Sequence, residues 1–194
     1  MQTKIPIAGL GPEPTWKDTR AKLRADHQRL LEMLQLAGDQ RRSAWTHPSF
    51  ICVLCYRLSN YFNRNGWFKA ARLLWHLNSL ICGADVSQYS ELGEGLVIVS
   101  PPGTALMGRS GRNLTVMPCA GIGGEMGKWK DIGAGPGLPV LGDDVILEPH
   151  AGILGPIHIG DRARIGPGVV VTYDIPADTI LPAHAARAFH RRDL

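Results

Sequence analysis

The sequence has no long hydrophobic run and no long block of like charge. Its longest apolar stretch, near residues 73–82, is interrupted by His76, Asn78 and Ser79, so we expect no membrane span and no membrane partner. The net charge is only +4, with lysine and arginine never grouped beyond a pair, which argues against nucleic-acid binding. Residues 1–11 lack the features of a signal peptide. Together these absences predict a cytoplasmic protein.

Cysteine is scarce, with 4 in 194 residues. Cys52 and Cys55 form a single C-x-x-C, but the second pair of a zinc site is missing, as is a thioredoxin-like βαβ context. We therefore predict buried thiols on a helix face and no metal site.

What the sequence does contain is a six-residue repeat. Residues 141–176 divide into LGDDVI, LEPHAG, ILGPIH, IGDRAR, IGPGVV and VTYDIP. Each unit opens with an aliphatic residue, and a small or β-branched residue follows four places later. This period fits neither an α-helix nor simple strand alternation. It predicts a parallel β-helix in which the aliphatic residues stack into an internal ladder.

The rest of the chain falls into segments around this repeat. Helices are expected from a cap at Thr15 or Asp18 to Gly38, from Pro48 to about residue 65, and from Trp67 to about Cys82. The predicted fold class is α+β. We expect a helical domain at residues 1–82, a β-helix at 83–176 with a loop inserted at about 124–139, and a cap and tail at 177–194.

Several motifs together resemble the serine O-acetyltransferase family of hexapeptide acyltransferases. They are THPSFICVLCYRLSNYF, GADV at residues 83–86, LGEGLV, IGGEMGK, ILGPIHIGDRARIGPGVVV and YDIPADT. The resemblance implies a left-handed β-helix, a homotrimer with active sites between subunits, and pairing of two trimers through the helices. It also implies acetyl-CoA, or another acyl-CoA, as the acyl donor, and a histidine base oriented by an aspartate.

The sequence departs from this family in the half of the site that binds the acceptor. Ser100 stands where the family has its catalytic histidine, and Val99 replaces the neighbouring aspartate. The family's R-H-P reads Gly137-Leu138-Pro139. Asp85 does match the orienting aspartate, although a structural cap is an equal interpretation of it. Ser100 is thus the candidate acceptor-binding residue.

The half of the site that binds CoA is better preserved. Gly123, Gly124, Lys128 and Gly155 keep family-like positions, and glycine allows a pantetheine arm close to the backbone. Glycine is also what any β-helix corner needs, so both interpretations stay open. The closing G-I/V-P-A-R motif of the family is only partly matched by residues 183–187, AHAAR. Its arginine, Arg187, is the candidate phosphate contact.

A relocated base is the remaining question, because an alkyl hydroxyl needs one to attack a thioester at neutral pH. His150 in LEPHAG is the best candidate, with Glu148 as its orienting partner; the alternative is a surface histidine. His158 and His184 are weaker candidates. Cys119 is a candidate acyl-accepting thiol or, without a base, a small core residue.

Two functional hypotheses follow from this pattern. The first is a divergent acyl-CoA-dependent acyltransferase acting on a small hydroxyl- or amine-bearing acceptor. The second is a catalytically inactive homologue that serves as a trimeric binding or regulatory scaffold. Another chemistry in an inherited CoA or nucleotide cleft is a third option, because fold does not fix function. The sequence does not identify the acceptor.

Overall fold

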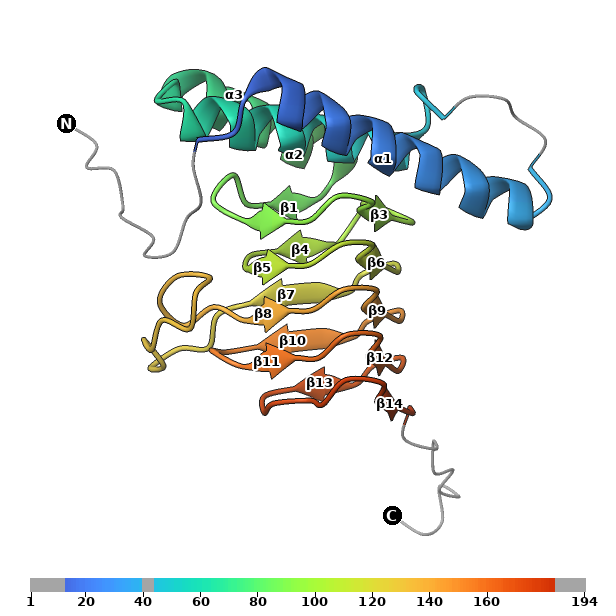
Figure 1. Ribbon diagram of the computed structural model, residues 1–194, viewed down its shortest axis with the longest axis vertical. Helices are drawn as coiled ribbons and strands as arrows, with labels where there is room; N and C mark the ends of the chain where they lie inside the picture. Colours follow the sequence, from blue (N-terminus) through green and yellow to red (C-terminus); the bar gives the residue numbers. More distant parts are fainter. Residues whose placement is uncertain (1–12, 40–43, 184–194) are drawn as a thin grey trace, which may run out of the picture.

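Three helices lie across the end of a column of short strands (Figure 1). The structure, a computed structural model, describes residues 13–39 and 44–183. None of the helices in these residues has the length and apolar character that crossing a bilayer would require.

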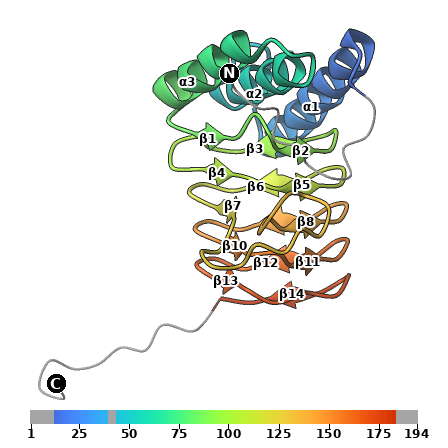
Figure 2. The same ribbon diagram turned by 90° about the vertical axis from the view of Figure 1, so that its left-hand side faces the viewer.

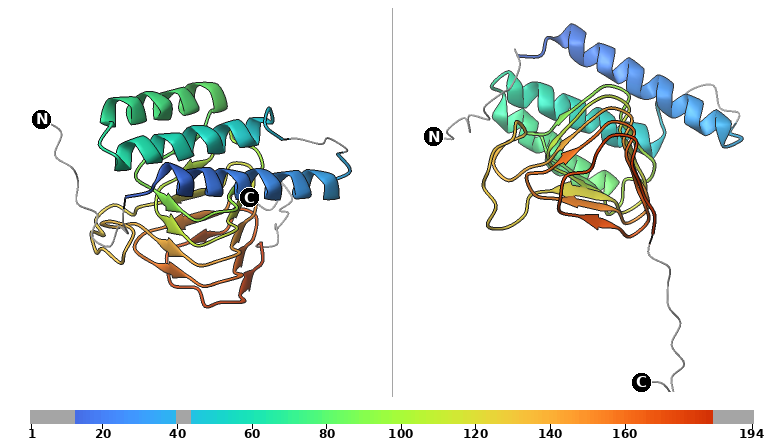
Figure 3. Two further views of the ribbon diagram at one scale, coloured as in Figure 1. Left: turned by 45° about the horizontal axis from the view of Figure 1, so that its top comes forward. Right: turned by 60° about the horizontal axis from the view of Figure 1, so that its bottom comes forward.

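The helices begin and end close to where their sequence signals predict. Helix α1 (Trp16–Leu36) starts at a capping box in which the Thr15 hydroxyl accepts from the Asp18 N–H and the Asp18 carboxylate accepts from the Thr15 N–H. Helix α2 (Pro48–Arg64) has proline in its first turn. Helix α3 (Phe68–Cys82) ends at Gly83, whose φ of 66° suits glycine. Figure 3 shows the three helices side by side.

The strands form three parallel sheets that make the three faces of a β-helix (Figures 2 and 3). The first face is β1 (Asp85–Val86), β4 (Ala105–Leu106), β7 (Gly121–Gly123), β10 (Gly152–Leu154) and β13 (Val170–Val171). The second is β2 (Glu91–Leu92), β5 (Arg109–Ser110), β8 (Val140–Leu141) and β11 (His158–Ile159). The third is β3 (Val97–Ile98), β6 (Thr115–Val116), β9 (Ile146–Leu147), β12 (Arg164–Ile165) and β14 (Ile180–Leu181).

The six-residue register predicted from the sequence is confirmed in the core. The residues that open the six units, Leu141, Leu147, Ile153, Ile159, Ile165 and Val171, are all at most 2% exposed. The predicted left-handed parallel β-helix is therefore the observed fold. One boundary differs, because β14 pairs with β12 beyond Pro176, where the sequence repeat predicts the coil to end.

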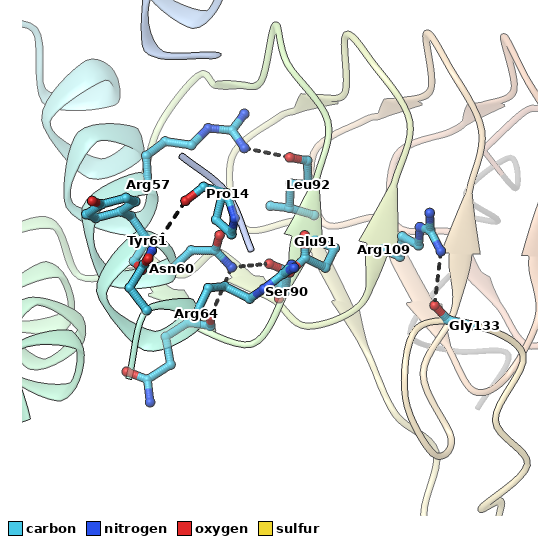
Figure 4. A network of polar contacts seen from close by, with 12 residues as sticks. Pro14, Arg57, Asn60, Tyr61, Arg64, Ser90, Glu91, Leu92, Arg109 and Gly133 are labelled. Atoms are coloured by element: carbon cyan, nitrogen blue, oxygen red, sulfur yellow. Dashed lines mark hydrogen bonds and ion pairs between the residues drawn. The ribbon is translucent and has the colours of Figure 1, made fainter. Parts of the chain in front are cut away.

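A buried ion pair fastens the helices to the first turn of the coil. Arg57 of α2 binds both carboxylate oxygens of Asp26 of α1, and the two side chains are 4% and 1% exposed. The guanidinium also donates to the Leu92 carbonyl (Figure 4), while Asp26 accepts from the Leu96 N–H. Arg29 of α1 donates to backbone oxygens of the first and second turns at Gly95 and Leu114. The two buried charges are thus paired with each other and hydrogen-bonded to the backbone, which offsets the free-energy cost of removing them from water.

The turns between faces stack into three edges. We call the first the proline edge, because each turn contains proline; it consists of residues 99–104, 117–120, 148–151 and 166–169. The polar edge consists of residues 93–96, 111–114, 142–145, 160–163 and 176–179. The third is the loop edge, where residues 124–139 leave the coil between β7 and β8 (Figure 1).

Candidate functional site

The predicted catalytic residues and Ser100 all lie at the proline edge. Ser100, Glu148 and His150 are in its turns. Asp85 begins β1 and pairs with Ala105, the residue that follows the first of these turns. The stacking of the coil therefore brings residues up to 65 positions apart in the sequence to one side of the molecule.

The order of the turns sets the distance between these residues. The turn of Ser100 is followed by the turn of Cys119 and then by that of His150, since β3, β6 and β9 are consecutive in their sheet. Neighbouring parallel strands are about 4.8 Å apart, so His150 lies roughly 10 Å along the edge from Ser100. It therefore lies on the edge where the family would have its base, but two turns away from that position.

His150 is exposed, as its place in the repeat predicts. Its φ is 61°, a left-handed backbone conformation that is uncommon outside glycine. Its N–H donates to the Pro118 carbonyl of the preceding turn at 3.0 Å, which fixes the backbone of the turn. The imidazole is thus carried outward from a rigid support.

The two carboxylates predicted to orient a base have other partners. Glu148 is 9% exposed and forms an ion pair with Arg164 of the next turn. Asp85 accepts a hydrogen bond from the indole N–H of Trp75 at 2.8 Å, which ties α3 to β1. In the described residues no hydrogen bond joins either carboxylate to His150, and Asp85 is engaged with α3.

The turn that contains Ser100 is held from two sides. The Ser49 hydroxyl of α2 donates to the Val99 carbonyl at 2.9 Å. The Ser100 carbonyl accepts from the Thr104 hydroxyl at 3.3 Å, and two prolines lie between them. Ser100 itself is half-buried. The backbone here is restricted, which suits a residue that would position a ligand rather than move toward it.

The candidate CoA-binding residues gather at the loop edge. The Gly155 N–H donates to the Gly123 carbonyl at 3.0 Å, and Gly124 follows directly. Lys128 forms an ion pair with Glu125 at 2.8 Å. A Cβ on Gly155, whose φ is +94°, would lie 2.9 Å from the same carboxylate. Glu125 is therefore the centre of this group, and Lys128 would have to leave it to meet a phosphate.

The inserted loop folds on itself before returning to the coil. The Gly137 N–H donates to the Lys130 carbonyl, and the Asp131 carboxylate accepts from the N–H groups of Gly133 and Gly135. Arg109 of β5 donates to the Gly133 carbonyl at 3.4 Å (Figure 4). At the outer part of the loop, Met126 and Trp129 are 96% and 75% exposed.

The first face of the coil connects the two groups. Its outward residues are small in three turns, at Ala105, Gly121 and Gly152. The same face also carries two exposed aliphatic residues, Leu154 and Val170. The strand from Gly152 to Leu154 spans about 7 Å. A ligand that is extended across this face can therefore reach from the glycines of the loop edge to the turns of the proline edge.

The structure corrects the interpretation of Cys119 as a core residue. It is exposed, with a φ of 58°, and lies on the proline edge between the turns of Ser100 and His150. A signal was present in the sequence: the dipeptides Pro102-Gly103, Pro118-Cys119, Pro149-His150 and Pro167-Gly168 occupy equivalent turns. Trp75, the partner of Asp85, had no comparable signal.

Two further predictions concern the C-terminal residues and a metal site. Arg187, the candidate phosphate contact, and His184 lie outside the described residues. In residues 13–39 and 44–183, no group of three or more histidine, cysteine, aspartate and glutamate side chains is placed to hold a metal ion.

Comparisons with known proteins agree with this architecture. Residues 139–173 match the family model for the bacterial transferase hexapeptide (six repeats). The chain is 30% identical over 152 residues to a serine acetyltransferase of Helicobacter pylori (strain J99), covering 75% of this chain and 86% of that protein.

Solved structures give the same picture. A serine acetyltransferase of Neisseria gonorrhoeae in complex with serine superposes with a TM-score of 0.74 at 23% identity, covering 89% of this chain and 69% of that one. A serine acetyltransferase in complex with CoA gives a TM-score of 0.73 at 18% identity, covering 89% and 70%. At these identities the structures support the fold alone.

Proposed function

The chain belongs to the serine acetyltransferase family, and from that premise we propose that it is a divergent acyl-CoA-dependent acyltransferase. It transfers an acetyl or other acyl group from the CoA thioester to a small hydroxyl- or amine-bearing acceptor other than serine. The observation that carries this proposal is the placement of the two groups of candidate residues on the two borders of one face of the coil.

The donor half of the proposed site is the loop edge. Gly123, Gly124 and Gly155 leave the backbone open to a pantetheine arm. Lys128 is exposed and can exchange its ion pair with Glu125 for a phosphate oxygen, because exposed pairs of this kind are weak. Acetyl-CoA is the expected donor, in keeping with the relatives and with the CoA complex among the structural neighbours.

The acceptor half is the proline edge. Here Ser100 replaces the family's histidine and binds one end of the acceptor. His150, roughly 10 Å along the edge, takes the proton from a hydroxyl or amine at the other end. A second family motif, which would hold the carboxylate and ammonium groups of serine, reads Gly137-Leu138-Pro139 here and lies at the end of the loop edge rather than at the proline edge. Its neutral side chains do not favour a zwitterionic acceptor. The altered site thus supports a change of acceptor along with a relocated base.

The second candidate function is a catalytically inactive scaffold. It is favoured by the engagement of Asp85 with Trp75 and of Glu148 with Arg164, which leaves His150 without a carboxylate to orient it. Under either function we propose a homotrimer, with pairing of two trimers through the helices as a further step. The cytoplasmic location remains a prediction.

The test begins with CoA binding measured by calorimetry. Thioester loss is then followed with a panel of hydroxyl and amine acceptors that includes serine. His150→Gln is expected to lower kcat about 10²- to 10⁴-fold, with His158→Gln as the matched control, since His158 is an exposed histidine on the second face.

Three outcomes separate the hypotheses. Turnover of a non-serine acceptor that depends on His150 supports the acyltransferase. CoA binding without turnover of any acceptor supports the scaffold. No measurable CoA binding contradicts the acyltransferase proposal.

A further inference from the structure

The polar edge shows how side chains meet on consecutive turns of this coil. Asn113, Asp144, Arg162 and Asp178 occupy equivalent turn positions, all with φ between 57° and 59°. In two of the three consecutive pairs the side chains bond directly. Asn113 Nδ2 donates to Asp144 Oδ1 at 2.9 Å, and Arg162 Nε donates to Asp178 Oδ1 at 2.6 Å. Equivalent left-handed positions on neighbouring turns can therefore bring side chains into contact, although no hydrogen bond joins the third pair, Asp144 and Arg162, in the described residues.

Cys119 and His150 have this same relation on the proline edge. Their φ angles are 58° and 61°. The strands on either side of them are in register, with Val116 opposite Leu147 and Gly121 opposite Gly152. Their Cα atoms are therefore about 5 Å apart. Side chains at such positions meet in two pairs of the polar edge. A thiol and an imidazole at these positions are therefore close enough to come into contact.

The neighbouring turns leave room for this pair. The equivalent positions above and below are Gly103 and Gly168, so among the described residues no side chain occupies the left-handed position of either adjacent turn. A Cβ on Gly103 would lie 3.0 Å from the sulfur of Cys119. The sulfur points toward the turn before it, where it lies 3.7 Å from the Pro102 carbonyl oxygen. It must therefore rotate about χ1 to face His150 on the turn after it, and the contact that it gives up is weak.

We propose that Cys119 is an acyl-accepting nucleophile and that His150 is its base. This deepens the proposed function and rests on it. The thiol gives its proton to the imidazole, the sulfur attacks the thioester carbonyl, and the bond from the acyl carbon to the CoA sulfur breaks. The departing CoA thiolate takes the proton from the imidazolium, which leaves an S-acyl Cys119 and free CoA.

The second half of the reaction returns the enzyme to its starting state. The acceptor gives its proton to His150 as its oxygen or nitrogen attacks the S-acyl carbon. The bond between that carbon and the Cys119 sulfur breaks, and the cysteine thiolate recovers the proton. One histidine thus serves both steps without the aspartate that the family uses, because its partner is the neighbouring thiol.

The other cysteines make Cys119 easy to single out. Burial raises the pKa of the Cys52 thiol to about 12, and it also raises the pKa of Cys55 and of Cys82. Thiols react as thiolates, so iodoacetamide at pH 7 should modify Cys119 first in the native protein. The other three act as internal controls in peptide mapping.

Two measurements test the proposal in the full-length protein. The first is the rate of Cys119 alkylation, which we expect to fall about tenfold in His150→Gln and to stay unchanged in His158→Gln. The second is incubation with acetyl-CoA in the absence of an acceptor. We expect release of CoA and a mass increase of one acetyl group on the Cys119 peptide, lost in Cys119→Ala and kept in Cys55→Ser.

Failure of this proposal is distinguishable from failure of the proposed function. An alkylation rate that does not depend on His150 overturns the pair. Turnover that persists in Cys119→Ala, with no acetyl adduct in the wild type, overturns the nucleophile and leaves a direct transfer by His150. Absence of CoA binding, seen in calorimetry before any variant is compared, overturns both.

Discussion

The polar edge and the proline edge are built on the same backbone turn and use it differently. On the polar edge the left-handed position of the first turn is Gly95, and the later turns carry asparagine, aspartate and arginine, which bond in two of three consecutive pairs. On the proline edge the left-handed positions carry glycine, cysteine and histidine. The contrast indicates that one edge stabilises the stack, whereas the other leaves chemically reactive side chains exposed.

The largest expected effect separates the crowded first position of a turn from its open left-handed position. A Cβ on Gly160 of the polar edge would lie 2.2 Å from the Ala177 nitrogen, and one on Gly166 of the proline edge would lie 2.4 Å from the Leu181 oxygen. One on Gly168, at the left-handed position of the same proline-edge turn, would meet nothing within 4 Å. We expect Gly160→Ala to lower the free energy of unfolding by about 3 kcal/mol or more. Gly168→Ala should cost only the strain of its positive φ, about 1 kcal/mol.

Urea unfolding of the two variants measures this difference. Equal losses would mean that the left-handed position of the proline edge is as closely packed as the first position of a turn, which would contradict the open space at Gly168.

A smaller effect separates stability from function at the left-handed positions. Asn113→Gly removes the hydrogen bond to Asp144 and should lower the free energy of unfolding by about 1 kcal/mol. His150→Gly relieves an uncommon backbone conformation and should change the free energy of unfolding by less than about 0.5 kcal/mol. The same substitution should abolish transferase activity. Thermal unfolding and thioester assays on both variants provide the test. A strongly destabilised His150→Gly would assign the histidine a structural role instead.

The smallest expected effect concerns the free energy of unfolding at acidic pH. Hydrogen bonds from Arg162 hold the pKa of Asp178 below its ordinary value near 3.8, and bonds from Arg112 do the same for Asp143. A lowered pKa in the folded state means stability that is present above that ordinary value and is lost as pH falls below it. The stability difference between wild type and Arg162→Gln should therefore shrink as pH falls through 3.8.

The matching control is on the other edge. The stability difference between wild type and Gly168→Ala should not change over the same pH range, because that substitution affects no titrating pair. A loss of both differences at low pH would point to general acid unfolding rather than to the polar edge.

The sequence predicts the regular part of the coil because its period is visible without knowledge of contacts. Leu141 to Val171 are spaced so that only one register buries all of them. Upstream the period is broken: the chain takes seven steps from Ile98 to Ala105, but only five from Val116 to Gly121 in the equivalent turn. With the turns out of step, the position of Cys119 on the edge could not be read from spacing.

The contacts of the candidate carboxylates depend on elements whose orientation the sequence does not specify. The ion pair of Glu148 with Arg164 joins adjacent turns diagonally, and the bond from Trp75 to Asp85 requires the rotation of α3 about its axis. Motif spacing identifies which residues share an edge. It does not determine which partner each side chain selects there.

The binding of Arg57, Asp26 and Arg29 to the backbone of the first turns has a consequence for the whole stack. A β-helix ends in unpaired N–H and C=O groups, and such an end can accept a strand from another molecule. Here side chains of α1 and α2 occupy the Leu92 and Gly95 carbonyls and the Leu96 N–H. The helices thereby block end-to-end polymerisation from this side, and a coil expressed without them would be expected to aggregate.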